Sequence, residues 1–240
     1  MVTALGSWRA SEHLFASTKS MSAVAVRRSR FCSVHAGDGA TAGLSAHAGA
    51  GSMNATVMSG MRTAEELASL TALNIGSGAR PFADAVNLDI TSDTNPDIVH
   101  DVRELPWPFE SDRFTELRAI DVLEHLPDLV ATMEEIHRIC AAEGRVQIVV
   151  PHFSSNNSYT DPTHLHHLGI MSFDYFTGEH QHSYYTRCRF RTVSRKIEFL
   201  NRPQDRVMSR LAARWPVLYE RRFAWIFPAW LMRFELEVLK

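Results

Sequence analysis

The sequence predicts an α/β fold built on a mainly parallel, twisted sheet with flanking helices. Three observations predict it. Short apolar segments alternate with helical or loop segments between residues 72 and 151. A glycine turn, Gly76-Ser77-Gly78, directly follows the first apolar segment, where a strand would end. In the last segment, residues 230–240, apolar and polar side chains alternate strictly from Met232 to Val238, which is typical of a half-buried strand.

The individual elements follow from local patterns. Residues 63–70 predict a short helix, with Thr63 as N-cap and Glu66 as its capping-box partner. An amphipathic helix is predicted over residues 129–144. Strands are predicted at residues 72–75, 85–89, 98–99, 114–121 and 145–151, and an antiparallel edge hairpin pairs residues 189–200 with residues 230–240, the last strand of the sheet.

The first crossover is too short for a helix. Only nine residues separate Gly76 from Val86, and Pro81 interrupts them. Parallel strands usually need about a dozen residues to cross over. The first crossover helix is therefore predicted to be reduced to a turn.

Bulk properties narrow the class of protein. With 45% hydrophobic and 22% charged residues in 240, the chain can bury one sizeable core. A net charge of −2 gives no reason to expect a nucleic-acid partner. The three cysteines are scattered without disulfide or metal spacing, which favours a reducing, cytoplasmic compartment.

Residues 1–60 differ from the rest of the chain. They are rich in Ser, Ala and Gly, carry few acids and show no sustained periodicity. We interpret them as a disordered or artefactual leader, although a transit peptide or a later start are alternatives. Residues 61–240 are predicted to form the folded domain.

Five short motifs occur in order: LNIGSG, NLDI, HDVRELPW, AIDVLEHL and GRVQIVVP. Residues 73–151, which contain them, resemble the class I S-adenosylmethionine (SAM) dependent methyltransferases of the type 11 kind. The resemblance implies a Rossmann-like sheet and SAM as the cofactor. It also implies the roles of individual residues at the ends of the strands.

The resemblance implies two groups of cofactor contacts. Gly76 and Gly78 let the backbone pass close to the methionine part of SAM, because no Cβ intervenes. Asp121 would lie beside the sulfonium. Asn74 holds a position where many members of the family carry an acid, so an amide would supply only part of that hydrogen bonding.

The nucleoside end of the cofactor would lie over the next two strands. Asp89 ends its strand and would accept two hydrogen bonds from the ribose diol. Ile90 would lie against the adenine ring. Asp101, with Val102, would meet the adenine edge and accept from its amino group.

Residues 152–185 are predicted to form the acceptor loop, because they follow the fifth strand and hold six of the 12 histidines. Expected acceptor contacts are Tyr159, His166, Phe173 and Tyr175. The candidate general bases are His125 and His164. A metal site built from Asp161, His164, His166 and His167 is a further interpretation. Their spacing matches no recognised ligand pattern, so the sequence predicts no metal.

Residues 204–230 are basic and aromatic. Arg206, Arg210 and Arg214 recur every four residues and share one helix face, with several tryptophans nearby. This segment is interpreted either as a lid that packs on the domain or as an interfacial helix in peripheral contact with a membrane. The two interpretations are compatible if the acceptor is lipid-linked or anionic.

These patterns together predict a SAM-dependent methyltransferase with a small-molecule, glycan-precursor or lipid-linked acceptor. One alternative is a nucleotide-cofactor oxidoreductase on a similar sheet, which would bind NAD in place of SAM. The other is a non-catalytic methyltransferase-like binding module, which would bind SAM without turnover.

Overall fold

The computed structural model describes residues 62–178, 181, 183–200, 202–203 and 205–240. The predicted leader, residues 1–60, lies outside the described residues. Within them, the strands are β1 (Ala72–Ile75), β2 (Val86–Asp89), β3 (Ile98–Val99), β4 (Phe114–Ile120), β5 (Cys140–Pro151), β6 (Arg189–Glu198) and β7 (Leu231–Leu239). The α-helices are α1 (Ala64–Ser69), α2 (Leu129–Ile139), α3 (Asn157–Thr160), α4 (Asp205–Arg214) and α5 (Pro216–Arg222).

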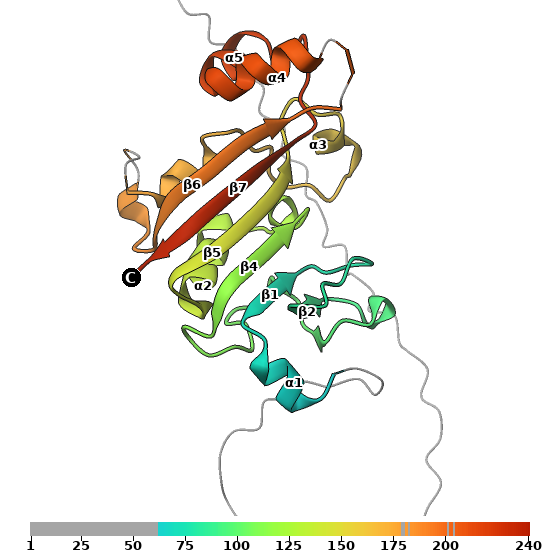
Figure 1. Cartoon of the computed structure of the whole chain (residues 1–240), viewed down its shortest axis with the longest axis vertical. Coiled ribbons are helices and arrows are strands. Elements are labelled where there is room, and N and C mark those ends of the chain that lie inside the picture. The colour runs from blue at the N-terminus through green and yellow to red at the C-terminus, as the bar shows by residue number, and fades with distance from the viewer. Residues whose placement is uncertain (1–61, 179–180, 182, 201, 204) are drawn as a thin grey trace, which may run out of the picture. The chain divides into compact units, whose positions relative to one another are not determined.

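The strands form one sheet in the order β3-β2-β1-β4-β5-β7-β6 (Figure 1). Neighbouring strands from β3 to β5 are parallel, whereas β7 runs antiparallel to both β5 and β6. This order, with the last strand reversed, is the class I methyltransferase arrangement that the resemblance implies. The predicted fold class is therefore confirmed.

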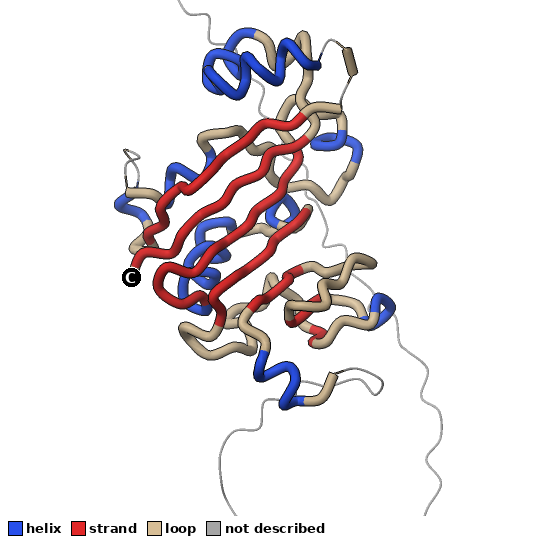
Figure 2. The backbone as a smooth tube through the Cα atoms, viewed as in Figure 1, coloured by secondary structure: helices blue, strands red, loops and turns tan. Residues whose placement is uncertain are grey.

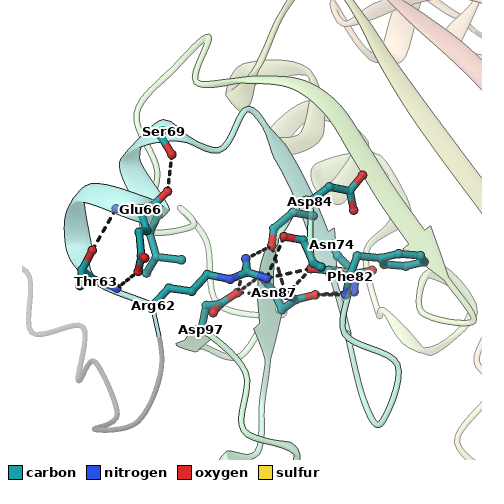
Figure 3. Close-up of polar contacts among 12 residues, drawn as sticks. Arg62, Thr63, Glu66, Ser69, Asn74, Phe82, Asp84, Asn87 and Asp97 are labelled. Atoms are coloured by element: carbon teal, nitrogen blue, oxygen red, sulfur yellow. Dashed lines mark hydrogen bonds and ion pairs between the residues drawn. The ribbon is translucent and has the colours of Figure 1, made fainter.

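Two local predictions are confirmed at the ends of the domain. The side chain of Thr63 accepts a hydrogen bond from the backbone nitrogen of Glu66, and the carboxylate of Glu66 accepts one from the backbone nitrogen of Thr63, which completes the capping box of α1 (Figure 3). In β7 the four apolar side chains of the alternating pattern are buried: Met232, Phe234, Leu236 and Val238.

The predicted helix over residues 129–144 is too long. Helix α2 ends at Ile139, and β5 begins at Cys140, which pairs with Phe114 of β4. A bulge then separates this pair from the regular pairing at Arg145, and Glu143 adopts a left-handed φ of 61°. Strand pairing thus overrides the helix propensity of the two alanines at 141 and 142.

The first crossover contains no helix, as predicted, and the side chain of Asn87 organises it instead (Figure 3). Its Oδ1 accepts from the Phe82 backbone nitrogen at 2.8 Å and from the Asn74 amide at 3.0 Å. Its Nδ2 donates to the carbonyls of Phe82 and Ala85 and to Asp97, at 2.9, 3.1 and 3.0 Å. One buried amide thereby ties β1, β2 and the turn between them.

Arg62 closes the same network from outside the sheet (Figure 3). Its guanidinium donates to the carbonyls of Ala85, Ala83 and Phe82 at 2.6, 3.0 and 3.2 Å. It also lies 3.4 Å from Asp97, whose carboxylate accepts from the backbone nitrogen of Asn87 at 2.8 Å. In a helix, backbone groups would have satisfied one another by hydrogen bonding. In this turn, side chains supply those hydrogen-bond partners instead.

The two faces of the wide part of the sheet are covered differently. Helix α2 buries Met133, Ile136 and Ile139 against one face. Figures 1 and 2 look onto the other face, which no helix of the described residues covers across β4, β5 and β7. Charged residues lie opposite each other there across four strands, in the order Glu116, Arg145, Glu237 and Arg191. Glu237 forms ion pairs with both arginines.

Replacing Asn87 with alanine should destabilise the domain. The substitution leaves several buried backbone and side-chain groups without a partner, at about 1–3 kcal/mol for each unsatisfied group. We expect a loss of at least about 2 kcal/mol in the free energy of unfolding, measured in urea. Asn156→Ala is the matched control, because Asn156 is exposed and its side chain makes no capping bond. Equal losses in the two variants would contradict the role of the network.

Candidate functional site

The strand order places a crevice between β1 and β4. The chain leaves β1 toward β2 on one side, and leaves β4 toward β5 on the other. In open α/β sheets, ligands bind at such a switch point, outside the carboxyl ends of the strands. Gly76 directly follows β1 and Asp121 directly follows β4, so the two motif residues meet at this point.

A cavity of about 540 Å³ opens at the switch point. Its volume lies within the range of about 300–1,000 Å³ that is usual for small-molecule sites. Six of the eight predicted cofactor residues line it, together with the candidate base His125: Gly76, Asp89, Ile90, Asp101, Val102 and Asp121. The other lining residues are Leu88, Arg103, Val122, Leu126, Thr163 and Leu165.

A smaller cavity of about 290 Å³ adjoins the first, because both are lined by Gly76 and Asp121. Asn74 and Gly78, the two remaining predicted cofactor residues, line this second cavity. The amide of Asn74 is already engaged, since it donates to Asn87 at 3.0 Å and to the carbonyl of Arg80 at 3.4 Å. The hydrogen bonds of the Asn74 side chain therefore stabilise the turn between β1 and β2.

A close backbone approach and an uncommon backbone conformation lie where the two cavities meet. Gly76 has a φ of 60°, and a Cβ there would lie 2.4 Å from Cγ2 of Val122. Asp121 has a φ of 56°, which is uncommon for a residue other than glycine. Its backbone nitrogen donates to the carbonyl of Val149 at 2.9 Å, which holds the strained residue in place. Such strain persists mainly at functional sites.

Asp89 has a carboxylate that is fixed but not saturated. One oxygen accepts from the backbone nitrogen of Gly78 at 2.7 Å and the other from that of Thr91 at 3.1 Å. A carboxylate has about four acceptor sites, so two remain for a ligand. The residue is 8% exposed and lines the larger cavity. This arrangement suits a diol donor.

Asp101 differs from its expected role as a free acceptor. Arg103 holds its carboxylate through bonds of 2.9 and 2.6 Å, to one oxygen each from Nε and Nη2. The hydrogen bond from Arg103 lowers the pKa of Asp101. Arg103 itself lines the cavity, and the sequence analysis missed it. The Asp-x-Arg spacing just after a strand was the available signal.

The predicted bases His125 and His164 lie together, beside a glutamate. Their rings meet edge to face with centroids 4.6 Å apart. Nε2 of His164 lies 3.9 Å from Oε1 of Glu124, and the Glu124 side chain is 1% exposed. Burial raises the pKa of Glu124 to about 7, and the negative charges of Asp121 and Asp161 add to the effect. The sequence analysis assigned no role to Glu124.

The predicted acceptor contacts lie outside the lining of the two cavities. Phe173 belongs to the core, is 1% exposed and packs on Phe234, so the expectation that it contacts an acceptor is corrected to a packing role. Tyr159 is exposed and stacks on His167. His166 contacts the carbonyl of Leu126 at 2.8 Å, and Tyr175 packs against Phe176. Instead, the acceptor loop reaches the larger cavity with two residues that sequence reasoning missed, Thr163 and Leu165.

Sequence comparisons find no relative: no protein-family model and no curated protein matches the chain. Many solved structures match the chain in fold, and representative matches cover 70–73% of it. A SAM-dependent methyltransferase from Archaeoglobus fulgidus is 14% identical with a TM-score of 0.46, over 71% of this chain and 87% of that chain.

Two further matches have the same level of similarity. A SAM-dependent methyltransferase from Mesorhizobium loti is 12% identical with a TM-score of 0.46, over 72% of this chain and 92% of that chain. A phosphoethanolamine N-methyltransferase from Haemonchus contortus has the same identity and TM-score, over 71% of this chain and 48% of that chain. At these values the likeness carries no argument about activity, and the assignment of the class I methyltransferase fold stands on strand order and on the direction of β7.

The close approach of Gly76 to Val122 gives a matched pair of variants. Gly76 and Gly78 both have positive φ, so alanine at either position pays the left-handed penalty of roughly 1–2 kcal/mol. Only at Gly76 would the new Cβ also clash, because nothing lies within 4 Å at Gly78. We expect Gly76→Ala to lower the melting temperature clearly more than Gly78→Ala. Adding Val122→Ala should recover part of the loss, and equal effects of the two alanines would contradict the clash.

Proposed function

We propose that the chain is a SAM-dependent methyltransferase that acts on a small-molecule, glycan-precursor or lipid-linked acceptor. The observation that carries the proposal is the pair of adjoining cavities at the switch point between β1 and β4. A glycine turn with positive φ lies where they meet, and a buried carboxylate with spare acceptor sites lines the larger one.

The residues of the two cavities fit the parts of this cofactor. The unsaturated carboxylate of Asp89 suits the ribose diol, and the exposed side chain of Ile90 offers an apolar surface to the adenine ring. The turn at Gly76 and Gly78 lets the methionine part approach the backbone in the smaller cavity. When bound, SAM supplies an activated methyl group on a positive sulfonium.

The acceptor end of the larger cavity is formed by His125, Thr163 and Leu165. Leu165 supplies an apolar wall that excludes water from part of the site, while Thr163 and His125 offer polar atoms to a hydroxyl or amine. For an in-line displacement these residues mainly orient the acceptor, and such positioning can be worth about 7–11 kcal/mol. The negative charge of Asp121, beside Gly76, favours a positive centre at the junction of the two cavities.

Asp89→Ala tests the cofactor assignment. A hydrogen bond to a charged group contributes about 1.5–3 kcal/mol, so SAM affinity should fall roughly ten- to a hundred-fold in calorimetry. Asp93→Ala is the control, because Asp93 is an exposed acid a few residues away and lines neither cavity. Unchanged SAM affinity in a folded Asp89 variant would remove the ribose assignment. Binding of NAD with no SAM binding in the wild type would favour the oxidoreductase alternative.

The surface of helices α4 and α5 supports a lipid-linked acceptor. We call it the arginine–tryptophan surface, and it is defined by the exposed residues Arg206, Val207, Arg210, Arg214, Trp215, Leu218, Arg221, Arg222, Trp225 and Ile226. Trp225 and Ile226 are 69% and 68% exposed. None of these residues lines the larger cavity, which argues against a lid over it.

We propose that this surface rests on an anionic membrane. The two acids within residues 205–226 are turned inward: Asp205 is buried, and Glu220 accepts from the backbone nitrogen of Ile170 at 2.6 Å. Five arginines therefore face solvent, each worth about 1 kcal/mol near an anionic lipid surface. Tryptophans suit the boundary between headgroups and acyl chains. In the described part of the chain no helix has the length and apolar character to cross a bilayer.

Vesicle binding tests the arginine–tryptophan surface. The protein should sediment with vesicles that contain phosphatidylserine and not with vesicles of phosphatidylcholine alone, and high salt should release it. The pair Trp225→Ser and Ile226→Ser should weaken the binding at least about tenfold, since each side chain loses apolar burial of about 1.5–3 kcal/mol. Val193→Ser, which alters an exposed apolar residue on β6, is the control. Equal binding to both kinds of vesicle, or no effect of the pair, would contradict the proposal.

A further inference from the structure

We propose that Glu124, His125 and His164 bind one divalent transition metal at the wall of the larger cavity. This inference goes beyond methyl transfer, and it differs from the expectation from the sequence that the chain holds no metal. Among the described residues these three form the one group of His, Cys, Asp or Glu side chains whose ligand atoms lie within 4.8 Å of one another.

The carboxylate of Glu124 is the first argument. Both of its oxygens are fully buried, and neither has a hydrogen-bond partner among the described residues. A buried carboxyl group without partners costs several kcal/mol unless something compensates it. Nε2 of His164 faces it at 3.9 Å, too far for a hydrogen bond. A cation bound between the Glu124 carboxylate and Nε2 of His164 would compensate the charge of the carboxylate and fits the distance between the two groups.

The outer hydrogen bonds of the two histidines are the second argument. Nδ1 of His164 lies 3.3 Å from the carbonyl of Ser158, which can only accept, so this nitrogen carries the proton. Nδ1 of His125 lies 2.9 Å from Oγ1 of Thr163, whose hydroxyl donates to Asp161 at 2.6 Å and therefore accepts from the ring. In the neutral form of each ring these bonds leave Nε2 as the nitrogen that offers a lone pair, which is the arrangement of metal-bound histidines.

The backbone brings the three ligands together. Glu124 and His125 belong to the 3₁₀ helix Leu123–His125 that follows β4. The carbonyl of Glu124 accepts from the backbone nitrogens of Leu165 and His166 at 2.8 and 3.2 Å. These bonds hold the loop that carries His164, so main-chain contacts place this third ligand beside the other two. Metal binding would therefore cost little conformational entropy.

The donor set selects the class of metal. Two imidazoles and one carboxylate suit zinc or iron(II) and leave coordination positions open, whereas magnesium and calcium prefer oxygen ligands. Each metal–ligand distance is about 2 Å, so ligand atoms lie no more than about 4 Å apart in such a site. The side chains need to close only slightly to reach this geometry.

The place of the site suggests what the metal does. His125 and Thr163 line the larger cavity, so a metal bound here could coordinate a hydroxyl group of the acceptor through an open position. Such coordination would lower the pKa of that hydroxyl group. In that case the two histidines act as ligands and not as free bases. This use of the metal rests on the proposed methyl transfer, whereas metal binding by itself does not.

The experiment measures metal binding without cofactor or acceptor. The full chain is stripped with a chelator and titrated with Zn²⁺ against a coloured competitor, and with Co²⁺ followed by its visible spectrum. We expect one equivalent of each metal. Glu124→Gln and His164→Ala should each weaken Zn²⁺ binding by more than about a hundredfold, because loss of an outer-shell partner alone costs about 10–100-fold. Thr163→Val, which removes such a partner, should fall in that lower range.

His166→Ala and His167→Ala are the matched controls, since they remove histidines from the same loop that lie outside the cluster. Both should keep full metal binding, and circular dichroism checks that every variant is folded. Wild-type affinity no higher than that of the Glu124→Gln variant would overturn the proposal, as would equal losses in the controls. SAM binding by the stripped protein is scored separately, so failure of the metal site and failure of the cofactor site give different results.

Discussion

The hydrogen bonds of the Asn87 side-chain amide are the interactions on which the turn between β1 and β2 depends. Parallel strands normally obtain their crossover from a helix, whose backbone satisfies itself. Here the turn between β1 and β2 is too short, and its carbonyls turn toward Asn87 and Arg62. Asp97 completes the arrangement from the turn before β3. The glycine turn keeps its shape because these buried polar groups satisfy one another.

That turn and the end of β4 shape each other. Gly76 can approach Val122 only because it lacks a side chain, and Asp121 keeps a left-handed backbone because β5 accepts its nitrogen–hydrogen group. The residue just beyond, in the 3₁₀ helix Leu123–His125, is the orphaned Glu124. A steric constraint at the first strand therefore sets the position of the charged groups that follow the fourth. The two cavities and the proposed metal ligands are consequences of one local geometry.

The parts of the structure that the sequence predicted are those with a local signal. The capping box of α1 spans four residues, and the alternation of β7 has a period of two. The end of α2 was misjudged because Cys140 pairs with a strand far away in sequence. The partners of Asn87 and the approach of His164 to Glu124 are likewise contacts between distant segments.

Side-chain identity alone could not sort the acceptor loop. Phe173 and Tyr159 are both aromatic residues in the same loop, yet one lies in the core and the other on the surface. No periodicity marks which face of an irregular segment turns inward. Glycine and aspartate at strand ends were easier to assign, because their place relative to the sheet follows from the strands themselves.

The open face of the sheet has a consequence for how the strands align. Because helix α2 covers one side, β4, β5 and β7 carry apolar residues toward the helix and the charged residues Glu116, Arg145 and Glu237 on the opposite face, where two arginines cover Glu237. A slip of one residue in any of these strands would exchange the two sets. It would push Glu237 or Arg145 into the apolar layer and bring Leu236 or Val146 into water. The row of opposite charges across the four strands therefore contributes less to stability than to fixing the strand register. This matters most for β7, which pairs in antiparallel register with β5 on one side and β6 on the other.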